Sequence, residues 1–196
     1  MRFLFVCLSL VMWSSTFAQG KKLPFDVIPE APATYTACNV LARTIEGLGF
    51  RYRWATEDLT EEDLNYQFSE GSRTLDETLD HLYGLAETII NAIESKPSIR
   101  PLEIDHLTYE ERRYKTLFFL LRASQKLRKA NDADIQKMNI IFVRGERQSE
   151  FPFWNHLNGP IADALWHTGQ VVASRRASGN PLSPRVSVFM GTVRQQ

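Results

Sequence analysis

The stretch that decides the fold runs from Phe151 to Pro181 and reads FPFWNHLNGPIADALWHTGQVVASRRASGNP. Gly159 and Pro160 suit the start of a helix, because proline is tolerated at the first helical position. The run Gly179-Asn180-Pro181 suits its end, because glycine favours the left-handed turn after a helix and proline cannot continue one. Between these signals, apolar residues recur at helical spacing: Ile161, Ala164, Leu165, Val171 and Val172. The stretch therefore predicts an amphipathic helix that buries one face.

The same predicted helix carries an aspartate and a histidine that could act together. Asp163 and His167 are four residues apart, so their side chains leave one face of the helix, one turn apart. A carboxylate and an imidazole in this arrangement can hold one metal ion. A metal site needs at least one further ligand from another part of the chain.

Three earlier segments also show helical periodicity with start and stop signals. They run from about Thr34 to Ala55, from Ser72 or Thr74 to Lys96, and from Thr108 to Asn131. Four amphipathic helices with proline-rich connections predict an all-α fold, a four-helix bundle. Residues 140–143 have strand-like composition, but the sequence offers no evident second strand, so we expect an extended loop that crosses one end of the bundle.

The third ligand comes from the second predicted helix. His81 falls at the edge of its apolar stripe, where a side chain can reach a pocket between helices. His81, Asp163 and His167 then form a set of two imidazoles and one carboxylate, which suits nickel, zinc or iron(II). His156 is a spare candidate if the last helix begins earlier. Alternatively, these residues are polar groups at the edge of the core that pair with one another or with water.

Two motifs make the chain resemble a known family. The first is LDHLYGL around His81, and the second is HTGQVVASRRASGNP from His167 to Pro181. Together they resemble the DinB-like four-helix-bundle family over residues 34–184. The resemblance implies a metal triad in which His81 and His167 are ligands, and Asp163 stands where the family usually has a third histidine. Aspartate is a competent ligand, but the change also fits a site that has decayed into a hydrogen-bonded pair.

The resemblance also implies a class of chemistry. Members of the family use a metal to bind and ionise a small thiol, and then transfer or isomerise it. We therefore expect a metal-dependent transferase or hydrolase that acts on a small molecule, with no general base evident in the sequence. Glu77 or Asp80 could accept a hydrogen bond from the other ring nitrogen of His81, although both also suit solvated acids near a helix cap. The alternative is a non-catalytic binding or stress-associated module, with a degenerate metal site and dimerisation through exposed helix faces.

The first residues have the pattern of a secretory signal peptide. A positive start at Arg2 is followed by an apolar run from Phe3 to Trp13, too short to span a bilayer, and by a small residue at Ala18. We expect cleavage after Ala18, and therefore a secreted or periplasmic protein; an uncleaved membrane anchor is the alternative. The expected organisation is then a signal peptide at 1–18, an extended lead-in at 19–33, the bundle at 34–184 and a tail at 185–196.

Charge and cysteine content restrict the remaining classes of function. The chain has 23 Lys and Arg residues against 23 Asp and Glu residues, without a basic block, which argues against a nucleic-acid partner. Removal of the leader takes Cys7 and leaves Cys38, so the mature chain has no internal disulfide. Cys38 suits a small core residue better than a nucleophile.

Two further groups of residues each have a functional and a structural interpretation. An aromatic group (Trp54, Phe151, Phe153, Trp154 and Trp166) either walls a pocket or closes the core, and Arg175 and Arg176 either bind an anion or complement a helix C-terminus.

Overall fold

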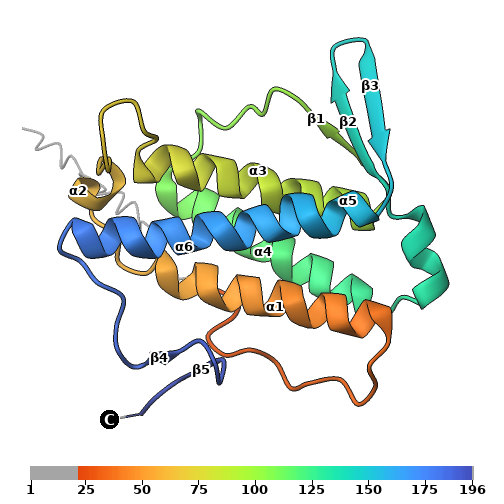
Figure 1. Cartoon of the computed structure of the whole chain (residues 1–196), viewed down its shortest axis with the longest axis horizontal. Helices are drawn as coiled ribbons and strands as arrows, with labels where there is room; N and C mark the ends of the chain where they lie inside the picture. Colours follow the sequence, from red (N-terminus) through yellow and green to blue (C-terminus); the bar gives the residue numbers. More distant parts are fainter. Residues whose placement is uncertain (1–21, 196) are drawn as a thin grey trace, which may run out of the picture.

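The computed structural model describes residues 22–195, and these residues are mostly α-helical (Figure 1). Four long helices make up most of the described chain: α1 (Ala37–Ala55), α3 (Leu75–Ile93), α4 (Tyr109–Leu127) and α6 (Ala162–Ala177). Shorter helical pieces are α2 (Glu61–Leu64), the 3₁₀ helix η1 (Asp132–Lys137), α5 (Trp154–His156) and the π-helical turn η2 (Leu157–Ile161). The long helices correspond to the four periodic segments of the sequence.

Side-chain caps fix where the long helices begin. Thr74 and Thr108 each accept a hydrogen bond from the backbone N–H three residues on, and a glutamate at that position bonds back to the cap. These are capping boxes, which satisfy N–H groups that a helix leaves unpaired at its start. Thr108 was the predicted cap of its helix, and Thr74 was one of two candidates, with Ser72. The cap of α1 lies two residues after the predicted Thr34, because Thr36 accepts the hydrogen bond from the N–H of Asn39.

The long helices share one apolar core. Helix α4 packs against α1 and α3, and α6 packs against the same two helices. Each helix contributes fully buried side chains, for example Ile45, Leu79, Leu117 and Val171. Burial of such side chains stabilises a fold by about 1.5–3 kcal/mol each. The core therefore lies along the apolar stripes that the sequence marks out.

A small three-stranded sheet contradicts the all-α prediction. Strand β2 (Ile140–Arg144) pairs in parallel with β1 (Pro97–Ile99) and antiparallel with β3 (Arg147–Phe151). The loop expected at 140–143 is thus a central strand. Gly145 has a positive φ of 59° and begins the two-residue turn between β2 and β3, which suits a tight hairpin. Strand β3 reads RQSEF and is exposed throughout, so it has no apolar alternation by which to recognise it.

The last helix does not begin at Gly159-Pro160, as the sequence predicted. Helical structure already starts at α5 and continues through η2 into α6. Gly159 lies inside this run with a non-helical φ of −97° and ψ of −109°. Because Pro160 has no N–H to donate, the backbone widens into a π-turn at this point. The pair marks a kink inside a longer helical segment.

The described part of the lead-in, residues 22–33, contains no helix or strand, as expected, and packs along α1. The ring of Phe25 is buried against Gly49, where an added Cβ would lie 2.5 Å from a ring atom. The N–H of Ile28 donates to the carbonyl oxygen of Gly191, the last residue of the turn between β4 (Val186–Ser187) and β5 (Thr192–Val193). Lead-in and tail thus support each other beside α1.

The described residues contain no helix both long and apolar enough to cross a membrane. The predicted signal peptide at 1–18 lies outside the described residues.

Candidate metal centre

His81, Asp163 and His167 come together in the structure. Asp163 lies between the two histidines: its Oδ2 is 3.0 Å from His81 Nε2, and its Oδ1 is 3.3 Å from His167 Nε2. One ligand atom from each of the three residues lies within 4.8 Å of the other two. The three residues predicted from the sequence therefore form a cluster that could hold a metal ion.

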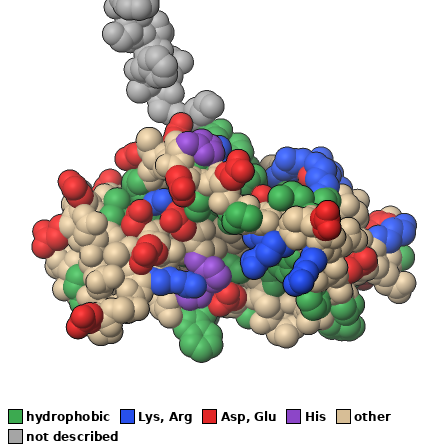
Figure 2. All heavy atoms as spheres, turned by 90° about the horizontal axis from the view of Figure 1, so that it is seen from above, with side chains coloured by type: hydrophobic (Ala, Val, Ile, Leu, Met, Phe, Trp, Pro, Cys, Tyr) green, Lys and Arg blue, Asp and Glu red, His purple; other side chains and the backbone are tan. Residues whose placement is uncertain are grey.

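The packing of α3 against α6 produces this geometry. His81 projects from α3, whereas Asp163 and His167 project from successive turns of α6. The two imidazole rings meet edge to face, with their centroids 4.5 Å apart. All three side chains are partly exposed, and Figure 2 shows histidine side chains reaching the surface. A metal ion held here would keep positions open toward solvent.

The surroundings of His81 favour its neutral form. Partial burial lowers the pKa of His81, and the positive charge of Arg73 acts in the same direction. The hydrogen bond with Asp163 opposes the shift without cancelling it. The net downward shift favours the neutral form of His81 at pH 7. In the contact with Asp163 the Nε2 of His81 donates its N–H, because a carboxylate can only accept. A metal ion bound at Nε2 would replace this proton.

Gln170 fixes the orientation of His167. The Nδ1 of His167 lies 2.6 Å from the side-chain oxygen of Gln170. The amide oxygen can only accept, so Nδ1 carries the proton and Nε2 keeps its lone pair toward Asp163 and His81. We did not predict this role from the sequence. The signal was present, because residues three apart on a helix are neighbours.

Glu77 and Asp80 do not support His81. The Glu77 carboxylate accepts a hydrogen bond from the N–H of Thr74, as part of the cap of α3. Asp80 pairs with the buried guanidinium of Arg112 at 2.6 Å. Glu77 is thus an acid of the helix cap, as the alternative held, whereas Asp80 is paired with a buried arginine and is not the solvated acid expected.

His156 lies outside the cluster and in an unusual environment. Its side chain is fully buried, and neither ring nitrogen has a hydrogen-bond partner among the described residues. Its ring meets that of Phe153 edge to face at 5.3 Å. Burial lowers the pKa of His156 to about 4. His156 is therefore a neutral core residue and does not serve as the spare ligand.

Cys38 is a core residue as well. It is 1% exposed, and burial together with Asp132 raises the pKa of its thiol to about 11. The thiol stays protonated at neutral pH, whereas a nucleophilic cysteine needs a lowered pKa.

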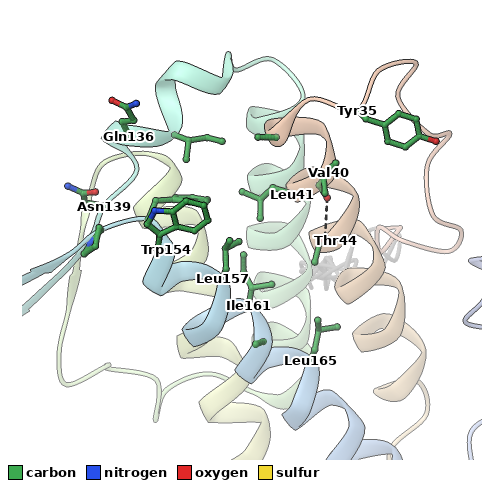
Figure 3. Close-up of a pocket in the computed structure, with 15 residues that line it drawn as sticks. Tyr35, Val40, Leu41, Thr44, Gln136, Asn139, Trp154, Leu157, Ile161 and Leu165 are labelled. Carbon is green, nitrogen blue, oxygen red and sulfur yellow. Dashed lines mark hydrogen bonds between the residues drawn. The ribbon is translucent and has the colours of Figure 1, made fainter.

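The aromatic group does not surround the candidate ligands. Phe153 and Trp154 line a groove between α1 and the η2–α6 segment (Figure 3). Trp54 donates a hydrogen bond to the carbonyl oxygen of Asp26 in the lead-in. Trp166 is one residue from His167 but is largely exposed. The group is thus divided between a separate groove, the lead-in and the surface.

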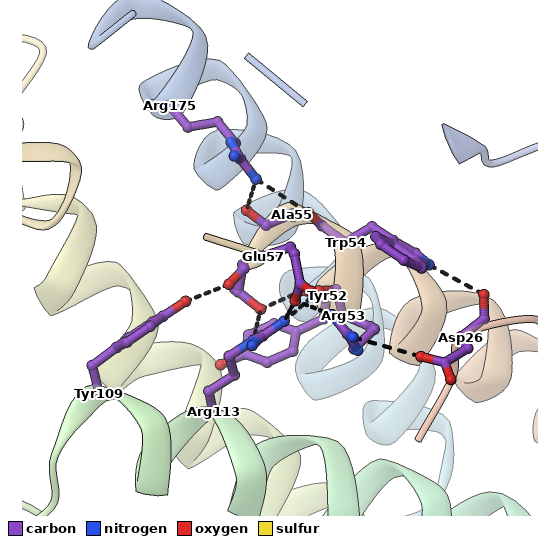
Figure 4. A network of polar contacts seen from close by, with 10 residues as sticks. Asp26, Tyr52, Arg53, Trp54, Ala55, Glu57, Tyr109, Arg113 and Arg175 are labelled. Carbon is purple, nitrogen blue, oxygen red and sulfur yellow. Dashed lines mark hydrogen bonds and ion pairs between the residues drawn. The ribbon is translucent and has the colours of Figure 1, made fainter. Parts of the chain in front are cut away.

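Arg175 complements a helix C-terminus, as one of its two interpretations held, but it is buried and the helix is α1 and not its own. Its guanidinium is buried and donates to the carbonyl oxygens of Trp54 and Ala55, at 3.2 and 3.0 Å, where α1 ends. It also donates to both oxygens of Asn180. Figure 4 shows the Arg175 side chain reaching from α6 to these carbonyls, beside a second cluster of Arg53, Glu57 and Arg113. Arg175 thus complements the C-terminus of α1 and does not clamp an anion.

The chain matches no family model, no curated protein and no solved structure.

Proposed function

We propose that the protein is an exported, DinB-like four-helix-bundle protein that binds one divalent transition metal ion through His81, Asp163 and His167. The ion would serve a transferase or hydrolase reaction on a small molecule. The observation that carries the proposal is the convergence of two imidazoles and one carboxylate, from two helices, within 4.8 Å of one another. The resemblance of the motifs around His81 and His167 adds to it.

The residues present fit such an ion. Two nitrogen donors and one oxygen donor are a usual set for nickel, zinc or iron(II) in a site with open positions. His81 is held neutral, and Gln170 fixes the tautomer of His167. Asp163 contributes the single negative charge of the donor set. In such a site a bound metal lowers the pKa of a coordinated water or thiol, which supplies a nucleophile at neutral pH.

Metal content measured by elemental analysis tests the proposal. Protein purified without a metal-affinity tag is incubated with nickel or zinc, desalted and analysed. We expect about one ion per chain in the wild type, none in His167→Ala and a weakened site in Asp163→Ala and His81→Ala. His106→Ala is the control, because His106 is exposed and belongs to no candidate cluster among the described residues. Equal metal content in wild type and all three ligand variants would show that these residues are not the ligands.

Gln170 provides a finer test of the same site. Loss of an outer hydrogen bond to a ligand typically lowers metal affinity by about 10–100-fold, so we expect Gln170→Ala to weaken binding within that range. Gln148→Ala removes another exposed glutamine, from β3, and should leave the affinity unchanged.

A non-catalytic module is the second candidate function. It is favoured by the contacts of Asp163, whose two carboxylate oxygens lie 3.0 Å from His81 Nε2 and 3.3 Å from His167 Nε2. These contacts connect the three side chains without a metal ion. If the wild type takes up no stoichiometric metal, the three residues form a polar cluster that joins α3 to α6. The non-catalytic module is then the function that the site supports.

A further inference from the structure

A groove of about 960 Å³ lies on the other side of α6 from the candidate ligands. Leu165 lines this groove, whereas His167 belongs to the cluster. Leu165 and His167 are two positions apart in the sequence, which corresponds to about 200° around the helix axis. Their side chains therefore leave nearly opposite faces of α6. The groove is therefore distinct from the proposed metal centre.

The groove has a buried floor and an exposed rim. Leu41 and Ile161 line it and are only 5% and 3% exposed. Val40 and Trp154 also line it and are 52% and 77% exposed. Figure 3 shows Val40, Leu41 and Thr44 along the α1 wall, facing Leu157, Ile161 and Leu165 on the η2–α6 wall. A slender molecule can reach such a floor, whereas a flat protein surface would contact the rim alone.

None of the described residues that line the groove is charged, although charged residues make up 23% of the chain. An ionised group placed inside would lose its hydration without gaining a counter-charge. The polar lining groups are hydroxyls and amides. Thr44 donates its hydroxyl to the carbonyl of Val40 and keeps free acceptor capacity, and Gln136 and Asn139 lie at one end. These groups suit a hydroxyl or an amide in the ligand.

We propose that this groove is a binding site for a neutral, elongated apolar molecule with an uncharged polar end. Its volume falls in the range of small-molecule sites, about 300–1,000 Å³. The site is independent of metal binding, so either proposal can fail without the other.

Two matched pairs of variants test the site. Val40→Glu places a charge on the groove wall, and Val27→Glu places the same charge at a valine of nearly equal exposure, 53%, that does not line the groove. Trp154→Ala removes an exposed groove aromatic, and Trp166→Ala removes one of similar exposure, 72%, elsewhere. All four positions are exposed, so the variants should fold, which circular dichroism checks.

The measurement is the fluorescence of Nile red, a neutral apolar dye, followed by its displacement with dodecanol or dodecanoate. We expect Val40→Glu to weaken Nile red binding by about tenfold or more, because it places a charge in an apolar groove, and Trp154→Ala to do the same, because it removes an aromatic contact with the dye. Val27→Glu and Trp166→Ala should stay within about twofold of wild type, the range expected for surface changes. Dodecanol should displace the dye at lower concentration than dodecanoate, because the carboxylate finds no counter-charge.

Three outcomes would overturn the proposal. The first is equal weakening by both members of a pair, which would indicate dye bound to general apolar surface. The second is stronger displacement by dodecanoate than by dodecanol. The third is a wild-type dimer, seen by analytical ultracentrifugation, that Val40→Glu dissociates, because a second copy of the chain would then occupy the groove.

Discussion

His156 shows at the scale of one residue how burial links stability to pH. The folded protein holds its ring fully buried, with a pKa of about 4, against about 6.5 in an unfolded chain. Between these values the unfolded state binds the proton more strongly. The contribution of neutral His156 is therefore fully present above about pH 6.5, and it is lost as the pH falls toward 4.

Replacement of His156 by leucine should reduce the acid sensitivity of the fold. The loss of unfolding free energy between pH 7 and pH 4.5 should shrink by roughly 2–3 kcal/mol, from the difference between the two pKa values. At pH 7 the variant should be as stable as wild type or more so, because it removes two unpaired buried nitrogens. Urea unfolding at both pH values measures this.

The exposed His106 serves as the control for that experiment. His106→Leu should keep the full pH dependence of the wild type. If His156→Leu shows the same pH dependence as His106→Leu, the histidine is hydrogen-bonded in solution and is not buried without a partner.

The candidate ligands were predictable residue by residue because each depends on a local pattern. Asp163 and His167 follow from four-residue spacing in one helix, and His81 from its place beside an apolar stripe. The unpaired state of His156 was not predictable, since it depends on the π-turn that follows it and on packing from distant segments. Sequence patterns thus identify groups that share a helix face more reliably than groups that lack a partner.

At the scale of elements, Gly49 links α1 to the lead-in. Glycine has no Cβ, so another group can pack closely against a helix at this position. In the structure it is the ring of Phe25 that occupies the space, and an added Cβ would lie 2.5–2.7 Å from three ring atoms. Only glycine leaves room for this aromatic ring to pack against the helix, which holds Phe25 of the lead-in against α1.

Gly49→Ala should therefore destabilise the protein, although alanine favours helices. We expect a loss of about 1–3 kcal/mol in unfolding free energy, because overpacking forces Phe25 to move. Gly169→Ala is the matched change in α6, where nothing lies within 4 Å of the added Cβ, and it should gain up to about 1 kcal/mol from helix propensity. Thermal or urea unfolding measures both, and a Gly49→Ala variant as stable as Gly169→Ala would show that Phe25 does not rest on this helix.

The ends of elements were predictable where they depend on residues close in sequence, such as a helix N-cap or the helical spacing of apolar residues. Thr74 and Thr108 are such caps. The sheet was not predictable in this way, because β2 finds its parallel partner about 45 residues earlier, at Pro97–Ile99, and its antiparallel partner in a polar strand. The pairing depends on where α3 ends relative to the hairpin, which is a property of tertiary packing.

At the scale of the whole molecule, the motif HTGQVVASRRASGNP divides into two parts with different roles. Its first part carries His167 and Gln170 of the candidate metal centre. Its second part connects α6 to other elements. Arg175 binds the end of α1, and Ser178 and Asn180 donate hydrogen bonds to Asp63 of α2. A resemblance in this second part therefore reports on the assembly of the fold more than on chemistry.

Arg175→Ala should accordingly cost stability without removing the metal site. The substitution leaves the buried carbonyl groups at the end of α1 without their donor, and each such unpaired group costs about 1–3 kcal/mol. We expect a loss of about 2–4 kcal/mol in unfolding free energy, with metal binding retained by the folded fraction. Arg176→Ala provides the control, because this neighbouring arginine is exposed, and surface changes usually stay within about 0.5 kcal/mol. Equal stability of the two variants in urea would place Arg175 at the surface, and the connection between α1 and α6 would then depend on the apolar core alone.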